Sequence, residues 1–176
     1  MLAFHPSDDA PAGLAPRSYT LYSIHMIYLA ADHRGFARKE ALKKFLAERG
    51  IATEDCGALM YDPQDDYTDF AVAAAAKIAQ NTQEHKGIFL CGSGQGMDIV
   101  ANKFRGIRAA LCWDMDEAKK SRNDDDANVL VLASDESDEM QASKIVTVWL
   151  ETPFSGEERH IRRLKEIEEI EAANFK

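Results

Sequence analysis

Short apolar runs alternate with longer amphipathic segments along the chain from residue 27 onward. The runs at 27–31 and 88–90 are too short to form helices and are followed by turns that contain glycine, so we expect buried strands there. Similar runs predict further strands at 51–56, 107–112 and 129–132. Apolar residues at helical spacing predict helices over 36–50, 67–80, 97–104, 116–122, 136–150 and 157–173.

Short apolar strands that alternate with helices are typical of a parallel sheet whose two faces are both covered by helices. The predicted fold class is therefore α/β, with five strands in one sheet. In such sheets ligands bind beyond the carboxyl ends of the strands. The turns at that edge are 32–35, 91–96, 113–116 and 133–135, so we expect all the interesting polar residues of the chain to fall on this one rim.

The stretch at 87–103 combines a strand, a loop with three glycines and the start of a helix. This arrangement brings backbone N–H groups and the positive end of a helix dipole to one point, which favours an anion or a developing oxyanion. Cys91 and Ser93 lie beside that point. We therefore expect the chemistry of the protein to be centred on this loop, although a cysteine at a strand end is by itself more often a packed small hydrophobic residue.

The chain length of 176 residues predicts one domain, which we place at 26–176. Residues 1–25 hold three of the five prolines and lack hydrophobic periodicity and the features of a secretory signal, so we expect a flexible leader. An arm that packs on a partner subunit is the alternative.

A net charge of −9 argues against nucleic acid or an anionic membrane as partner, but does not exclude a small anion held by a few local cations. No apolar run approaches the roughly 20 residues of a membrane span. The three cysteines are widely spaced, without a CxxC pair, and indicate reduced thiols in a cytoplasmic protein with no metal framework.

Five blocks of sequence, in order, resemble the family of type-B ribose-5-phosphate isomerases and galactose-6-phosphate isomerases. They read ADHRGFARKEALKKFL, DCG followed by DDYTDFA, CGSGQGMDIVANKFRGIRAALC, ANVLVLA, and ERHIRR. The resemblance covers about residues 27–170. It implies a three-layer α/β/α sandwich on a five-stranded parallel sheet, a homodimer or dimer of dimers with composite active sites, and no metal or organic cofactor. The implied reaction interconverts an aldose phosphate and a ketose phosphate through an enediolate.

The resemblance also assigns roles to individual positions. Cys91 matches the cysteine that serves as the base in one branch of the family, and Ser93 matches the residue that assists it. A second branch uses a carboxylate as the base, at the position that Met97 occupies here. The amides of Gly92, Gly94 and Gly96 would hold the enediolate oxygens, and donors near a thiol lower its pKa. The remaining matches are to groups that bind sugar hydroxyls or phosphate, namely Asp32, His33, Tyr67, Arg159 and Arg163.

The chain departs from the family pattern at several positions. Asp124 stands where relatives carry the histidine that opens the sugar ring, and Asp125 stands where they carry an asparagine. Asp124 can still move a proton, and Asp125 can still bind a hydroxyl. Asp135 occupies a turn where relatives often place a phosphate-binding arginine, and a carboxylate there would repel a phosphate. Three consecutive acids at 124–126 do not converge on one cation, so we expect no metal there.

We therefore expect a cofactor-independent aldose–ketose isomerase that acts on a small sugar or sugar phosphate. The loss of the ring-opening histidine favours substrates that exist as open chains, such as four-carbon sugars. Alternatives are an isomerase of another pentose or of an unphosphorylated sugar, with Asp135 binding a hydroxyl, and a non-catalytic sugar-phosphate-binding subunit. His33 could also serve only as a helix cap, and Arg159 and Arg163 could simply balance the acidic terminal helix.

Overall fold

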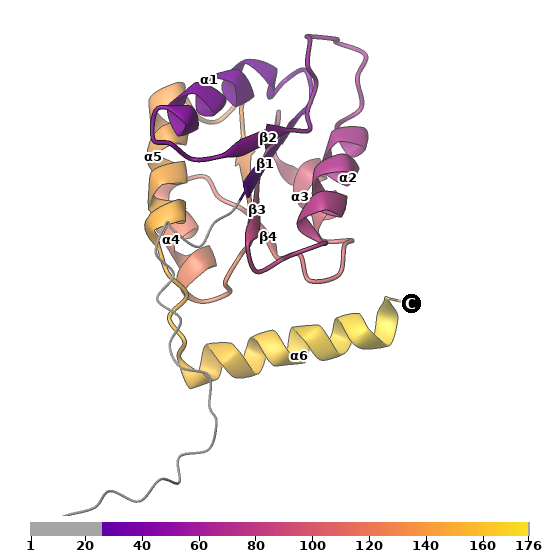
Figure 1. The fold of residues 1–176 in the computed structure, drawn as a ribbon, viewed down its shortest axis with the longest axis vertical. Coiled ribbons are helices and arrows are strands. Elements are labelled where there is room, and N and C mark those ends of the chain that lie inside the picture. The colour runs from indigo at the N-terminus through magenta and orange to yellow at the C-terminus, as the bar shows by residue number, and fades with distance from the viewer. Residues whose placement is uncertain (1–25, 176) are drawn as a thin grey trace, which may run out of the picture.

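The computed structural model describes residues 26–175, so the leader expected at 1–25 lies outside the described residues. Strands and helices alternate as the hydrophobic pattern predicts (Figure 1). The strands are β1 (Met26–Ala31), β2 (Thr53–Asp55), β3 (His85–Cys91), β4 (Ala109–Leu111) and β5 (Val129–Ala133). The helices are α1 (Phe36–Ala47), α2 (Tyr67–Ile78), α3 (Gln95–Ala101), α4 (Met115–Asn123), α5 (Glu139–Glu151) and α6 (Glu158–Asn174).

The strands form one parallel sheet in the order β2-β1-β3-β5-β4. β3 lies at the centre, between β1 and β5. Its last residues pair with the last residues of both neighbours, Ala31 with Leu90 on one side and Ala133 with Cys91 on the other. The turns that follow β1, β3 and β5 therefore emerge side by side, which places the predicted loop between two flanking turns.

Helices cover both faces of the sheet, as expected for strands that are apolar on both sides (Figure 1). α1, α4 and α5 pack on one face through a core that includes Leu46, Leu130 and Trp149. α2 and α3 pack on the other face through residues such as Ile78 and Met97. The predicted three-layer α/β/α sandwich is confirmed.

The edge strands β2 and β4 are shorter than the apolar runs predicted, with three residues each. Each of these strands has only one neighbour in the sheet. The first and last residues of the two apolar runs are not paired with that neighbour. α5 begins three residues later than predicted, because Asp138 caps it by accepting the backbone N–H of Gln141 at 2.7 Å. These shifts lengthen the turn that follows β5.

The terminal helix α6 is confirmed, but it extends away from the sandwich and runs past the edge where the strands begin (Figure 1). Its far half touches that edge through Glu171, which accepts the backbone N–H of Gly106 at 2.9 Å. The isoleucines of this helix, Ile161, Ile167 and Ile170, are 40–61% exposed, and His160 is the buried residue of the helix. None of the helices in residues 26–175 is long and apolar enough to cross a membrane.

Candidate functional site

The glycine loop after β3 holds the Cys91 thiol inside the rim of the sheet. Cys91 is only 4% exposed, and its Sγ accepts the backbone N–H of Gly94 at 3.2 Å. Gly94 has φ 77°, and a Cβ there would lie 2.4 Å from a methyl group of Leu111, so this position requires glycine. Ser93 is exposed at the tip of the loop. The Gly94 amide, expected to face an enediolate oxygen, thus points at the sulfur.

The balance of effects on Cys91 differs from the expectation that helix and loop donors lower its pKa. Burial raises the pKa of the thiol, and the nearby Asp32 carboxylate raises it further. Hydrogen bonds from the backbone N–H groups of Met97, Gly94 and Gly96 lower the pKa without reversing the shift. The expectation of a lowered pKa is therefore wrong for this chain by itself, because desolvation of the thiolate outweighs the donors.

The turn between β1 and α1 is fixed by Asp32, which is 5% exposed. Its Oδ1 accepts the backbone N–H groups of Arg34 and Gly35, both at 3.0 Å. Gly35 packs directly on β3, since a Cβ there would meet the carbonyl oxygen of Leu90 at 2.6 Å. One carboxylate oxygen thus organises the turn, and the turn is locked against the strand that carries the thiol.

His33 has a partner that the sequence did not reveal. Its Nδ1 donates to Asp65 Oδ1 at 2.6 Å, and its backbone N–H donates to the same oxygen at 3.0 Å. The side chain of Asp65 is 8% exposed, so a buried carboxylate fixes the orientation of the imidazole. The acid-rich loop 62–66 before α2 was the available signal, but nothing in its spacing pointed to His33.

Tyr67, the first residue of α2, lies against the same loop. A Cβ on Gly96 would meet the Tyr67 ring at 2.5 Å. Tyr67 is 38% exposed and therefore forms a wall of the site that a ligand can contact. The predicted residues Asp32, His33, Tyr67, Cys91 and the loop glycines thus share one rim.

Asp135, where the sequence raised an objection to phosphate binding, also lies on this rim. Its carboxylate forms an ion pair with the guanidinium of Arg34. The acid is therefore matched by an arginine from the neighbouring turn, which the sequence alone did not indicate.

The other predicted residues lie at the opposite edge of the sheet. Asp124 is the C-cap of α4 and Asp125 follows it, both before β5 begins. The register places Val129 four residues, about 13 Å, from the level of Cys91, and both acids lie beyond Val129. Arg159 and Arg163 are exposed on α6, which runs along that same edge. The expectation that all of these residues share one rim is therefore wrong, because one chain does not bring the two groups together.

At this second edge the acids cluster with a buried histidine. His160 Nδ1 lies 2.8 Å from Ser155 Oγ and 3.9 Å from Asp124 Oδ1. Burial raises the pKa of Asp125, as does the neighbouring Asp124, while His160, Arg163 and Arg108 oppose the shift. The sequence analysis assigned no function to His160. The available indication was its position within the family motif ERHIRR.

Asp126 has a structural function at this edge. Its φ is 46°, and its carboxylate accepts from Arg108 at 3.0 Å and Arg122 at 2.7 Å. The run at 124–126 thus points in different directions, as expected for consecutive residues. Within residues 26–175 no group of three or more histidine, cysteine or acidic side chains is arranged to hold a metal ion.

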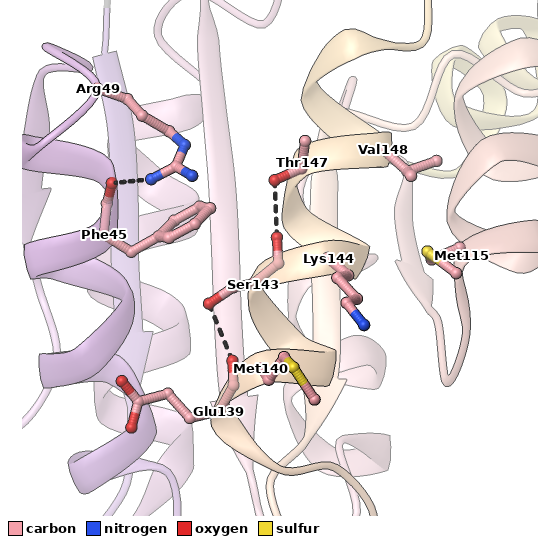
Figure 2. A pocket seen from close by; sticks show the side chains of 9 residues that line it. All are labelled: Phe45, Arg49, Met115, Glu139, Met140, Ser143, Lys144, Thr147 and Val148. Carbon is pink, nitrogen blue, oxygen red and sulfur yellow. Dashed lines mark hydrogen bonds between the residues drawn. The ribbon is translucent and has the colours of Figure 1, made fainter.

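A cavity of about 570 Å³ lies elsewhere, between α1, α5 and the start of α4 (Figure 2). Its lining is mainly apolar, with Phe45, Met115 and Met140. Arg49 lies on the Phe45 ring at 3.5 Å and donates to the Phe45 carbonyl at 3.1 Å, as Figure 2 shows. The cavity brings no acid–base pair together, so the chemistry is assigned to the rim around Cys91.

Comparison with known proteins agrees with this geometry. The sequence profile of the family described as Ribose/Galactose Isomerase matches residues 27–167. Ribose-5-phosphate isomerase B of Mycobacterium tuberculosis (strain CDC 1551 / Oshkosh) is 37% identical over 145 residues, which cover 82% of this chain and 89% of that protein.

Solved structures give the same result. The ribose-5-phosphate isomerase B of Mycoplasma genitalium with bound ribulose-5-phosphate matches with a TM-score of 0.82 and 35% identity, over 85% of this chain and 98% of that one. The enzyme from Thermotoga maritima matches with a TM-score of 0.77 and 42% identity, over 82% and 97%. The chain therefore belongs to the ribose/galactose isomerase family, as its sequence motifs predicted, and is an aldose–ketose isomerase.

Proposed function

We propose that the protein interconverts an aldose phosphate and a ketose phosphate by moving one proton between C1 and C2 of a short sugar. The Cys91 thiolate removes the proton from one carbon and returns it to the other, an enediolate forms between the two steps, and the hydroxyl proton passes between the oxygens on C1 and C2. Ser93 assists at the mouth of the loop. The amides of Gly92 and Gly96 stabilise the enediolate oxygens, and Gly94 stabilises the thiolate.

The observation that carries this proposal is the position of the thiol. Cys91 Sγ accepts the Gly94 N–H at 3.2 Å within the loop that joins β3 to α3, flanked by Asp32 and Tyr67. A merely structural cysteine needs neither a donor aimed at its sulfur nor an exposed aromatic wall beside it. The relative from Mycoplasma genitalium, whose structure holds a ketose phosphate, supports a sugar phosphate as substrate class.

We further propose that each active site is composite, with the rim of one chain facing the second edge of another. Asp32 and Tyr67 on the thiol side, and Asp125 on the partner side, then surround the sugar hydroxyls. His33 from one chain and two arginines from the other, Arg159 and Arg163, bind the phosphate. The exposed isoleucines of α6 support this assembly, because a second subunit would bury them. A homodimer is the smallest such assembly, and a dimer of dimers also satisfies it.

Asp124 determines which sugars this site accepts. Its side chain is 43% exposed and carries a carboxyl group where the family pattern has the histidine that opens the sugar ring. One positioned acid contributes about 10²–10⁴-fold to a rate. We therefore expect a four-carbon aldose phosphate, which forms no stable ring, to be turned over at least about a hundredfold faster than ribose 5-phosphate.

Coupled assays of the two substrates with the wild-type protein and Asp124→His test this expectation. The variant restores an imidazole at the position and should raise ribose 5-phosphate turnover selectively. Equal turnover of the two substrates by the wild-type protein would contradict the open-chain preference while leaving the isomerase activity itself intact.

The pH dependence follows from the raised pKa of Cys91. Only the thiolate acts as base, and burial shifts its formation to higher pH. We expect kcat/KM to increase with pH through and above the ordinary thiol range, with no plateau near neutrality. A pH series of kcat/KM, with the rate of iodoacetamide alkylation at Cys91 followed by mass spectrometry, measures both quantities. A flat profile below neutral pH would show that the base is not this thiol.

A further inference from the structure

The guanidinium of Arg34 lies on the glycine loop itself. A Cβ built on Gly92 would meet Arg34 Cζ at 2.7 Å and Nε at 2.7 Å, so the guanidinium occupies the space that a side chain at position 92 would fill. Gly92 directly follows the thiol. Among the described residues, this contact brings a permanent positive charge onto the loop that carries Cys91.

Arg34 is held there by Asp135 from across the loop. Arg34 follows β1 and Asp135 follows β5, and these strands flank β3, so the ion pair spans the carboxyl end of β3. The backbone N–H of Asp135 also donates to the Gly92 carbonyl at 3.1 Å. Arg34, Gly92 and Asp135 thus form one connected unit above the central strand.

The ion pair is open to solvent and easily exchanged. The side chains of Arg34 and Asp135 are 56% and 42% exposed. Ion pairs with this exposure contribute little net free energy, because water solvates both partners. A dianionic phosphate competes well for such a guanidinium, since it offers more charge and three acceptor oxygens.

Arg38, in the first turn of α1, shows the contrast between a structural arginine and one that can exchange its partner. Arg38 donates to the backbone carbonyls of Ser134 and Ser137, so its guanidinium is committed to holding the turn after β5. Arg34 and Arg38 are thus two guanidinium groups on a part of the rim that also carries the carboxylates of Asp32, Asp65 and Asp135.

We propose that Arg34 is the phosphate-binding cation that the thiol-bearing chain contributes to its own site, and that Asp135 holds the guanidinium in place until substrate phosphate displaces it. The proposal rests on the proposed function, in that the substrate is a sugar phosphate. It resolves the objection that Asp135 raises, because the acid pairs with Arg34 rather than facing the phosphate unmatched. His33, the neighbour of Arg34, then contacts the same phosphate from the side.

Inorganic phosphate serves as the probe, through calorimetric titration and through competitive inhibition of sugar-phosphate turnover by the full-length protein. We compare Arg34→Ala, Arg34→Lys and Asp135→Asn with Arg49→Ala, which removes an exposed arginine from the end of α1. Arg34→Ala should weaken phosphate binding at least about tenfold and raise KM similarly, with kcat changed by less than about threefold. Arg34→Lys should retain part of the phosphate affinity that Arg34→Ala loses. Arg49→Ala should bind phosphate as the wild-type protein does.

Asp135→Asn separates a binding role from a structural one. It frees the guanidinium and removes a competing negative charge, so phosphate should bind about threefold more tightly or better. Unchanged phosphate affinity in Arg34→Ala, or weakened affinity in Asp135→Asn, would overturn the proposal and leave the pair as a structural contact between two turns. Absence of isomerase activity in the wild-type protein would instead refute the proposed function, while the titrations still decide the role of Arg34.

Discussion

Replacement of Cys91 by alanine should lower kcat for sugar-phosphate isomerisation by about 10²–10⁴-fold, the range that a positioned general base contributes. The thiol is the ionisable group at the centre of the loop, and Met97 occupies the position at which the other branch of the family carries a carboxylate. Cys91→Ser tests the same point with nearly unchanged volume, because a hydroxyl does not ionise in the accessible pH range. Steady-state kinetics with the coupled assay measure both variants.

Cys56→Ala is the matched control for this experiment. Cys56 is a half-buried free thiol that lies beyond β2, separated from β3 by β1. Its removal should leave kcat within about twofold, since it adjoins no part of the proposed site. If the wild-type assembly is active and Cys91→Ala abolishes that activity, the alternative of a non-catalytic binding subunit is ruled out. Retention of activity in Cys91→Ala would mean that another group moves the proton.

A hybrid of two inactive chains should regain activity if the site is composite. We pair a Cys91→Ala chain with an Arg159→Ala/Arg163→Ala chain, each carrying its own tag. In the hybrid dimer one site combines the intact rim of one chain with the intact α6 of the other, and the second site lacks both. We therefore expect about half of the wild-type activity per dimer, although each variant alone loses about a hundredfold or more.

A site contained within one chain would give the opposite result. If one chain supplied all of these residues, neither chain of the hybrid would contain a complete site, and mixing would restore nothing. Lys165→Ala is the control on the same helix, because it removes an exposed cation outside the proposed site and should leave activity unchanged. Size-exclusion chromatography with light scattering establishes that every variant keeps the wild-type assembly.

The hydrophobic pattern was sufficient to predict the sandwich because each short apolar run marks a strand that must be buried on both faces. It was less accurate at the edges. β2 and β4 are shorter than predicted, since a strand with one neighbour is limited by that neighbour's register. The helix α6 was predicted correctly from its apolar spacing, but that spacing did not indicate that the helix extends away from the sandwich and leaves its isoleucines exposed.

The site was predictable in part for the same reason. The thiol and the glycines lie within six residues of one another, so local sequence determines their proximity. The pairing of His33 with Asp65 and that of Arg34 with Asp135 join residues 32 and 101 positions apart. Such contacts depend on which strands become neighbours and on where the loops between them return.

By itself, the sequence determined the fold class, the family and the loop on which the chemistry is centred, because periodicity and local motifs are short-range properties of a chain. Only the tertiary structure decided which of the functional residues lie at the same edge of the sheet. It placed Cys91 and Arg34 at the carboxyl edge and Arg159 and Arg163 beyond the opposite edge, since every strand of a parallel sheet points the same way and each helix returns the chain. It also decided the direction in which the pKa of the thiol shifts, because burial is a property of the packed molecule and raises the pKa that nearby donors alone would lower.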